Sequence, residues 1–276
     1  MPHEESSNAT VIPLSPGIEA ATKMHDISYA ENGHVGVLTL NRPHVHNALR
    51  DQSYAELTEL IRTATVRALV ITGAGQSFCS GDDVREIMGG GEGPAVTLAP
   101  KLTEAAEALL HTDIPIIAAV NGSAVGWGLE LALMADIRVA ARRARFGELQ
   151  VKRGLCSDVA GLGMLAQAVG RERAAELLFT GEVIDAERAE RIGLVGRVVN
   201  DDQLLPSALA LAERIAANPP LAVAAIKQGL RRALDPDWIE LGVWVSTTLG
   251  TLFATEDHRE GVRSFLEKRE PRYVGR

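Results

Sequence analysis

Two short runs of nearly continuous apolar residues constrain the fold of this chain most strongly. Residues 66–72 read Val-Arg-Ala-Leu-Val-Ile-Thr, and residues 114–120 read Ile-Pro-Ile-Ile-Ala-Ala-Val. Each run has the length of a strand and is followed by small turn-forming residues, Gly73 after the first and Asn121-Gly122 after the second. Both runs are therefore predicted to be strands that are buried on both faces. Hydrophobic residues make up 46% of the 276 residues, which is enough to build the core around them.

The rest of the chain alternates further strands with helices. In the first two thirds, the pattern predicts strands at 34–40 and 137–140, and helices at 47–64, 103–111 and 126–135. Asn47 is expected to cap the first of these helices. From Arg171 onward, helices are expected at 171–178, 185–192, 204–217, 221–233, 238–253 and 256–270, with one strand-like segment at 193–199. The order indicates an α/β fold of repeated strand-strand-helix units followed by a helical region.

This reading divides the chain into three parts. Residues 1–22 are polar and acidic and are expected to form a loosely ordered tail, 23–200 the α/β core, and 201–276 a helical C-terminal region. Residues 78–83 are predicted to form a turn, and the glycine-rich residues 88–94 a mobile loop.

The charge balance excludes several classes of partner. The chain has 28 Lys and Arg against 36 Asp and Glu, a formal net charge of −8. Nucleic acid and anionic lipid both require a basic surface, so neither is expected. The only cysteines, Cys79 and Cys156, are too few for a disulfide framework. With no signal-peptide pattern and no long apolar run, we expect a cytoplasmic protein that does not contact membranes.

The common signatures of catalytic and metal sites are missing. The sequence has no Gly-x-Ser-x-Gly, no Walker phosphate-binding loop and no His-Glu-x-x-His. His44 and His46 stand beside a turn and are read as solvated or structural histidines rather than metal ligands. No metal site is expected.

Two junctions between a strand and a turn are more informative. Residues 77–83 (Ser-Phe-Cys-Ser-Gly-Asp-Asp) and 121–128 (Asn-Gly-Ser-Ala-Val-Gly-Trp-Gly) place small residues where backbone N–H groups can approach a ligand. Together the two junctions could form an oxyanion hole, and the second would gain from the positive end of the helix that follows it. Taken alone, each junction is also compatible with an ordinary turn.

Two carboxylates precede or begin apolar helices. Glu130 is the only charged residue between Leu129 and Met134, and burial there would raise its pKa toward a value useful for acid or base catalysis. The alternative is that its carboxylate caps the helix N-terminus. Asp158 precedes another apolar segment, and its spacing alone favours an N-cap.

The ordered motifs of the chain resemble the enoyl-CoA hydratase/isomerase (crotonase) superfamily from about Ile27 to Arg276. The residues that carry this resemblance are Asn41-Arg42-Pro43 with Asn47-Ala48-Leu49, the strand from Val66 to Gly73, Phe78-x-Ser80-Gly81-x-Asp83, Ala119-Val120-Asn121-Gly122-x-Ala124-x-Gly126-x-Gly128-x-Glu130-Leu131, Phe146-Gly147, Thr180-Gly181, Gly193-Leu194-Val195, and Glu256-Asp257 with Phe265-Leu266-Glu267-Lys268-Arg269.

The resemblance implies a spiral of strand-strand-helix turns and a helical C-terminal region that forms trimers, often paired as hexamers. It implies an acyl-CoA thioester substrate whose carbonyl is held by the backbone N–H groups of Ser80 and Trp127. Each donor of such an oxyanion hole lowers the barrier by roughly 3 to 4 kcal/mol. Trp127 stands where the family usually has glycine, so its indole is expected to narrow or redirect the acyl pocket.

The second acid of the family is replaced in this chain. Hydratases of the family use two glutamates that share one water, and Glu130 matches the first. The second position is Gln150, whose amide can orient a water but cannot exchange a proton with it. Glu148 lies two residues earlier and would face the same side of an extended segment, so it is a candidate substitute.

Asp158 matches a position that carries an aspartate in two other branches. In dienoyl-CoA isomerases this aspartate belongs to a set of acidic residues, and in chlorobenzoyl-CoA dehalogenases it is the nucleophile. The resemblance therefore leaves several functions open. They are an enoyl-CoA hydratase for an uncommon acyl group, an enoyl-CoA or dienoyl-CoA isomerase, an acyl-CoA hydrolase or dehalogenase-like enzyme that uses Asp158, and a non-catalytic CoA-binding scaffold.

The resemblance also implies contacts with coenzyme A, which enters as part of the substrate. The backbone around Cys79, Ser80 and Asp82 is expected to hold the adenine, together with residues of a neighbouring subunit that match Phe265 and Lys268. Lys268 could bind a phosphate, or it could simply be an exposed lysine on the last helix. No metal or redox cofactor is implied, and a homotrimer or a dimer of trimers is expected.

Overall fold

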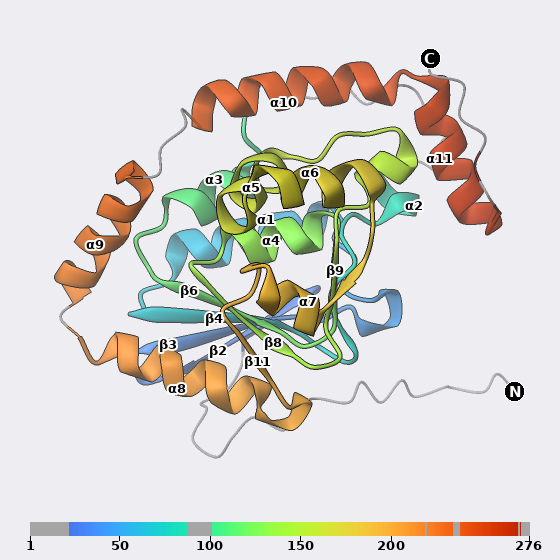
Figure 1. Cartoon of the computed structure of the whole chain (residues 1–276). Coiled ribbons are helices and arrows are strands. Elements are labelled where there is room, and N and C mark those ends of the chain that lie inside the picture. Colours follow the sequence, from blue (N-terminus) through green and yellow to red (C-terminus); the bar gives the residue numbers. More distant parts are fainter. Residues whose placement is uncertain (1–21, 88–100, 219, 234–237, 270, 272–276) are drawn as a thin grey trace, which may run out of the picture.

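A computed structural model describes residues 22–87, 101–218, 220–233, 238–269 and 271 (Figure 1). The expected tail, apart from Thr22, and the expected mobile loop at 88–94 lie outside these residues. No helix of the described part is long and apolar enough to cross a membrane.

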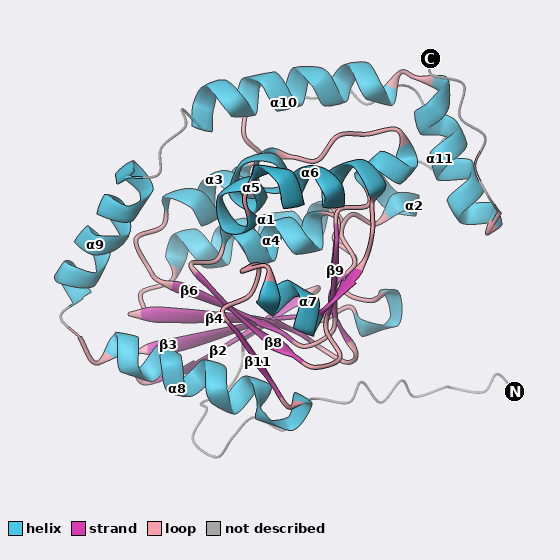
Figure 2. Cartoon of the chain, viewed as in Figure 1, coloured by secondary structure: helices cyan, strands magenta, loops and turns pink. Residues whose placement is uncertain are grey.

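A mixed sheet of seven strands organises the core (Figure 2). In spatial order its strands are β1 (Thr22–Lys23), β2 (Ile27–Asn32), β3 (Val35–Leu40), β4 (Ala68–Gly73), β6 (Ile116–Val120), β8 (Ile137–Ala141) and β11 (Arg197–Val199). From β3 to β11 neighbouring strands are parallel, whereas β1, β2 and β3 pair antiparallel. The two apolar runs form β4 and β6, in which every residue is buried, so that prediction is confirmed.

Helices cover both faces of this sheet. On one face, Val70 and Ile117 pack against α8 (Leu204–Ala216), and on the other face Leu69, Ile71 and Ile116 belong to the larger cluster. That larger cluster includes side chains of α1 (Asp51–Thr63), α3 (Glu104–His111) and α4 (Trp127–Met134). Figure 1 shows α8 on one side of the strands and these three helices on the other. Burial on both faces explains why β4 and β6 lack polar alternation.

A second sheet of four short strands lies beside the first. Its order is β10 (Ile184–Asp185), β9 (Arg145–Gly147), β7 (Ser123–Val125) and β5 (Ser77–Cys79). Strands β5, β7 and β9 run parallel, one from each successive strand-strand-helix unit. The sequence analysis missed these strands and treated 78–83 as a turn, because two or three residues are too few to show a period.

Asn47 does not cap α1, which begins at Asp51 after Arg50. Its backbone is left-handed (φ 57°), and its buried side chain ties the chain segments before the site together. Nδ2 donates to the carbonyls of Ala74, Ser77 and Phe78 at 2.8–3.2 Å, and Oδ1 accepts from Arg42 N–H at 3.0 Å. Asn47 therefore fixes the start of β5, which leads into the first junction.

The C-terminal third is helical, as predicted. It contains α5 (Leu165–Val169), α6 (Arg171–Thr180), α7 (Ala186–Arg191), α8, α9 (Pro220–Ala233), α10 (Trp238–Phe253) and α11 (Glu256–Glu267). In Figure 1, α9 and α10 run around the outside of the core and α11 descends beside it. The short segments are α2 (Val84–Ile87) and the 3-10 or π turns Pro43–Val45, Gln150–Arg153, Ala160–Met164 and Asp201–Gln203.

Candidate active site

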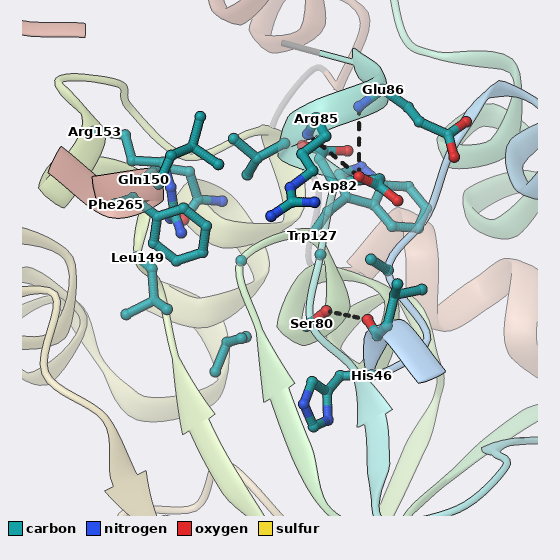
Figure 3. A pocket seen from close by; sticks show the side chains of 18 of the residues that line it. His46, Ser80, Asp82, Arg85, Glu86, Trp127, Leu149, Gln150, Arg153 and Phe265 are labelled. Atoms are coloured by element: carbon teal, nitrogen blue, oxygen red, sulfur yellow. Dashed lines mark hydrogen bonds between the residues drawn. The ribbon is translucent and has the colours of Figure 1, made fainter. Parts of the chain in front are cut away.

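A cavity of about 780 Å³ opens where the two junctions meet the C-terminal helix α11. Two groups of residues line its wall: one is Ser80, Asp82 and Trp127, and the other is Gln150, Phe265 and Lys268. Figure 3 labels all of them except Lys268. The structure thus brings together six of the residues singled out in the sequence, from four segments of the chain.

The first junction follows β5 and turns at Gly81. Gly81 has a left-handed backbone (φ +85°), and a Cβ there would lie 2.9 Å from the carbonyl of Val125 and 3.1 Å from the nitrogen of Trp127. The two junctions are therefore in direct contact, and a side chain at residue 81 would push them apart.

The N–H of Ser80, which the resemblance implies as an oxyanion donor, donates to the carbonyl of His46 at 3.1 Å in this structure. Its hydroxyl turns to the carbonyl of Val45 at 3.4 Å (Figure 3). By contrast, no hydrogen bond of the described residues uses the N–H of Asp82, two residues farther on. At this junction the N–H of Asp82 is therefore not used by any hydrogen bond within the described residues, whereas that of Ser80 is.

The second junction leads from β7 into α4. Gly126 has a left-handed backbone (φ 55°) and Trp127 is the first helical residue, so its N–H lies at the positive end of the helix. Within the described part of the chain, this N–H also has no hydrogen-bond partner. Gly128 is required for the packing, since a Cβ there would lie 2.1 Å from the carbonyl of Cys79. Cys79 itself is fully buried and is not among the residues that line the cavity, and the expected contact of the backbone around it with the adenine stays a prediction.

The indole of Trp127 turns inward rather than into solvent. It is 6% exposed and lies edge-on to the ring of Tyr54, with ring centroids 4.8 Å apart. The Tyr54 hydroxyl donates to Oδ1 of Asp82 at 2.5 Å. Burial raises the pKa of both the Tyr54 hydroxyl and the Asp82 carboxyl. Sequence analysis missed Tyr54, because a tyrosine within the apolar stripe of a helix has no signal of its own.

Glu130 lies in the first turn of α4 and is 1% exposed. Its Oε1 accepts from the amide of Gln150 at 2.8 Å and from the N–H of Asp158 at 3.0 Å. Both donors come from outside α4, so the carboxylate does not cap its own helix. Burial raises its pKa well above the usual range, and the nearby carboxyls of Glu148 and Asp158 add to the shift.

Glu148 is a second buried carboxyl in the same place. Its Oε2 accepts from the Ser157 hydroxyl at 3.1 Å, whereas its Oε1 is buried with no hydrogen-bond partner. A Cβ on Gly161 would lie 3.1 Å from Glu130 Oε1 and 3.1 Å from Glu148 Oε2. The distance between these two carboxyl oxygens is therefore no larger than the sum of the two distances. Burial raises the pKa of Glu148 as well. Two such carboxyls are not both ionised at neutral pH.

Gln150 connects this acid pair to the cavity. It begins the 3-10 turn Gln150–Arg153 and lines the wall, while its amide group donates to Glu130. Glu130, Glu148 and Asp158 lie behind the wall. An acyl group in the cavity would therefore meet Gln150 before it meets Glu130.

Asp158 stands just before the helical segment Ala160–Met164, as its spacing predicted. Its Oδ1 accepts from the next residue, Val159 N–H, at 2.6 Å, instead of from an N–H two or three residues into the helix. Burial raises its pKa, and its charge in turn raises the pKa of Glu130 and Asp82. Asp158 thus belongs to the acidic group around Glu130.

Phe265 of α11 and Lys268, which follows that helix, line the cavity within this chain, and their expected contact with the site of a neighbouring subunit stays a prediction. The guanidinium of Arg153 lies 4.5 Å from the centre of the Phe265 ring, an arrangement typical of cation–π attraction. Sequence analysis missed Arg153, one of several basic residues in its segment. His46 shares a hydrogen bond with Ser77, and the described residues contain no cluster of potential metal ligands.

The site and the fold define an α/β protein whose cavity lies beside a buried pair of carboxyl groups. The family model of enoyl-CoA hydratase/isomerase matches residues 30–276, and the chain belongs to this family. It is 41% identical over 252 residues to (E)-benzylidenesuccinyl-CoA hydratase from Thauera aromatica, which covers 88% of this chain and 97% of that relative. It is 36% identical over 259 residues to 1,2-epoxyphenylacetyl-CoA isomerase from Escherichia coli, covering 91% and 98%.

Solved structures agree with this assignment. An enoyl-CoA hydratase/isomerase from Pseudoalteromonas atlantica superposes with a TM-score of 0.81 at 29% identity, covering 90% of this chain and all of that one. The fold expected from the resemblance is therefore confirmed, and the chain is an enzyme of the enoyl-CoA hydratase/isomerase family.

Proposed function

We propose that this enzyme binds an acyl-CoA thioester and stabilises its enolate with the backbone N–H groups of Asp82 and Trp127. The observation that carries the proposal is that Asp82 and Trp127, whose N–H groups form no hydrogen bond within the described residues, line the same cavity as Gln150, the partner of the buried Glu130. A developing negative charge on the thioester oxygen would find both donors already in place. Coenzyme A enters as part of the substrate, and the proposed reaction needs no other cofactor.

Hydration of a 2-enoyl-CoA is the reaction that we favour. A base takes a proton from water as its oxygen bonds to the β-carbon, the electron pair moves to the thioester oxygen, and an acid then protonates the α-carbon. Glu130 and Glu148 together supply both roles when one of them is ionised as the base and the other is protonated as the acid. Gln150 can hold the water but cannot carry the proton.

Trp127 supports an uncommon acyl group as the substrate. Its indole occupies the place where most family members have only a hydrogen atom, and with Tyr54 it forms an aromatic pair beside the oxyanion hole. Flat, unsaturated or ring-bearing acyl groups pack well against such a pair. The relatives named for benzylidenesuccinyl-CoA and epoxyphenylacetyl-CoA support this preference.

Double-bond isomerisation of an enoyl-CoA or dienoyl-CoA is the second candidate, and Gln150 favours it. Isomerisation moves a proton from one carbon to another without adding water, so one carboxylate such as Glu130 could perform both transfers. Asp158 would serve as the second carrier. A hydrolytic reaction through Asp158 and a non-catalytic CoA-binding role have weaker support. Assembly as a homotrimer or dimer of trimers, and a cytoplasmic location, remain part of the proposal.

Turnover in oxygen-18 water tests this proposal. A panel of alkyl and aryl 2-enoyl-CoA and 3-enoyl-CoA thioesters is incubated with the enzyme. The products are separated by chromatography, and their masses are determined by mass spectrometry. Gain of one labelled water supports hydration, and a shifted double bond without mass gain supports isomerisation. The variant Glu130→Gln should lose at least about a hundredfold in kcat, while the exposed Glu59→Gln should not change it. Full activity of Glu130→Gln would refute the role of Glu130.

A further inference from the structure

Asp82 combines a proposed backbone donor with a carboxyl side chain on the wall of the cavity (Figure 3). Negative charge develops on the thioester oxygen when the enolate forms, and an ionised carboxyl on the donor residue would repel it. The repulsion is only weakly screened, because the cavity is lined by protein rather than surrounded by bulk water. An aspartate at this position therefore opposes the proposed reaction unless its charge is held away from the oxygen.

The backbone of Asp82 is held from the side opposite its N–H group. Leu49 N–H donates to the carbonyl of Gly81 at 2.8 Å, and Asp83 N–H donates to the carbonyl of Leu49 at 2.7 Å. Asp82 and Leu49 thus form a parallel bridge. Backbone N–H groups of successive residues in an extended chain point to opposite sides, so the N–H of Asp82 points away from Leu49. The bridge fixes the backbone of Asp82, and other contacts must place its side chain.

Tyr54 of α1 contacts the side chains of both proposed donor residues. Its hydroxyl donates to Oδ1 of Asp82 at 2.5 Å, and its ring stands edge-on to the indole of Trp127 with an interplanar angle of 88°. Tyr54 does not itself line the cavity, so it holds the two side chains from behind the wall. A distance of 2.5 Å is typical of a hydroxyl that donates to a charged carboxylate. The hydrogen bond thus directs one carboxyl oxygen toward Tyr54 and stabilises its charge there.

Three other titratable groups face Asp82 from the surrounding elements. Burial raises the pKa of the Asp82 carboxyl, the negative charge of Asp158 raises it further, and the positive charge of Arg153 lowers it. Burial also raises the pKa of the nearby Cys79 thiol to about 12, so this thiol is neutral. Within the described residues, only Tyr54 forms a hydrogen bond with the Asp82 side chain.

We infer that Tyr54 is a positioning residue of the oxyanion site, which holds the Asp82 carboxyl away from the substrate oxygen and so allows an aspartate to supply a backbone donor. This inference rests on the proposed function for the identity of the reaction. It adds a residue that contributes to the rate without touching the substrate. The hydroxyl of Tyr54 acts on charge, whereas its ring packs against Trp127 as a phenylalanine ring also could. Substitution can therefore separate the two roles.

Steady-state kinetics of Tyr54→Phe measure the role of the hydroxyl. The bound thioester is neutral and charge develops only in the transition state, so kcat should fall at least about tenfold while KM changes little. The loss should shrink as pH falls, because protonation of Asp82 removes its charge. The matched control is Tyr29→Phe, which removes the bond from a tyrosine hydroxyl to Glu31 on β2, away from the cavity, and should leave kcat and KM unchanged.

Removing the charge of Asp82 should rescue the loss. Asp82→Asn keeps the backbone N–H and the size of the side chain but never ionises. The double variant Tyr54→Phe with Asp82→Asn should therefore regain most of kcat, with no greater loss at high pH than at low pH. A role of Tyr54 in packing alone predicts a double variant no faster than Tyr54→Phe, and that result would overturn the inference. So would equal kcat values for Tyr54→Phe and the wild type at every pH.

Absorption spectroscopy adds a measurement that needs no turnover. In the background of Glu130→Gln, bound cinnamoyl-CoA should absorb at longer wavelength than the free thioester, since the two N–H donors polarise its conjugated carbonyl. Adding Tyr54→Phe should reduce this shift, and adding Asp82→Asn as well should restore it. A shift that Tyr54→Phe leaves unchanged would refute the inference alone. No shift in Glu130→Gln itself would mean that the donors do not hold the carbonyl, so the proposed function fails and the inference fails with it.

Discussion

Gln150 is the residue whose chemistry most limits the reaction. It fills the position of a second acid with an amide that donates a hydrogen bond to Glu130 but cannot transfer a proton. Its carbonyl oxygen is buried without a hydrogen-bond partner, as is Oε1 of Glu148. Two unpartnered acceptors in one buried site are costly unless a proton or a water lies between them. A protonated Glu148 would supply that proton.

The variant Gln150→Glu tests this view of the acid pair. If the missing acid limits hydration, the variant should add water to a 2-enoyl-CoA at least about tenfold faster, the low end for a positioned acid or base. The initial rate of water addition is measured spectrophotometrically beside Gln150→Ala, which removes the amide without adding an acid. An unchanged rate in Gln150→Glu would mean that Glu148 or Asp158 already performs the second transfer.

The pH dependence of the unfolding free energy should report the proton that Glu148 holds in the folded state. Because burial raises the pKa of Glu148 above its usual 4.5, the folded state holds a proton that the unfolded chain releases. This contribution is complete below the unfolded pKa and is lost as pH rises through the folded pKa, by up to about 1.4 kcal/mol per pH unit for one proton.

Urea unfolding of the wild type and of Glu148→Gln between pH 5 and pH 8 measures this difference. The wild type should lose stability relative to the variant as pH rises, because the glutamine never ionises. Parallel curves for the two proteins would show that Glu148 titrates normally in the folded state.

At the scale of elements, short strands and the turns between them build the site. The long features could be predicted from the sequence, since β4, β6 and most helices have clear apolar patterns. The three-residue strands β5, β7 and β9 have none, yet they determine where each junction points. Our proposal of Asp82 as an oxyanion donor depends on one hydrogen bond, from Ser80 N–H to the His46 carbonyl, that no local sequence pattern encodes.

Asn47 shows how such an element is held, and its replacement should destabilise the protein. Asn47→Ala removes four hydrogen bonds and leaves buried carbonyls unpaired, so we expect a loss of about 2 to 4 kcal/mol in unfolding free energy. Asn218→Ala, at an exposed helix end, is the control and should cost under about 1 kcal/mol. Equal effects in urea unfolding would show that the Asn47 contacts contribute little.

His258 tests whether the contact between α11 and the turn Gln150–Arg153 positions the wall of the cavity. His258→Leu loses the bond to the Arg153 carbonyl, whereas asparagine can keep a donor near the position of Nδ1. Displacing α11 by this change should raise KM for the acyl-CoA about tenfold, the effect of about 1.4 kcal/mol. His258→Asn should restore most of the affinity. Equal KM values in all three proteins, or a loss of kcat alone, would contradict a positioning role.

At the scale of the whole molecule, the site depends on segments that lie far apart in the sequence. The two junctions, Glu130, Gln150 and the C-terminal residues could each be singled out from the sequence because each belongs to a local motif. Their meeting in one cavity and the position of Tyr54 could not, because these depend on packing between segments that lie far apart in the sequence. The resemblance supplied the overall fold.

A ligand that spans these segments should stabilise the molecule as a unit. The Glu130→Gln variant offers a background in which a thioester remains unconverted. An acyl-CoA at a hundred times its Kd should then raise the unfolding free energy by about 2.7 kcal/mol, because it binds only the folded chain. The melting temperature, followed by circular dichroism, measures this gain as the ligand concentration is varied.

The same ligand titration distinguishes the contribution of Phe265 and Lys268 to binding from that of the pocket beside Trp127. In the background of Glu130→Gln, the added changes Phe265→Ala and Lys268→Glu should abolish most of the gain, since they remove the wall that α11 contributes. Free coenzyme A should stabilise less than the full thioester, because it leaves the pocket beside Trp127 empty. If neither ligand shifts the melting temperature, the cavity does not bind acyl-CoA. If both shift it equally, binding does not involve the oxyanion hole, and the donors of Asp82 and Trp127 have no role in recognition.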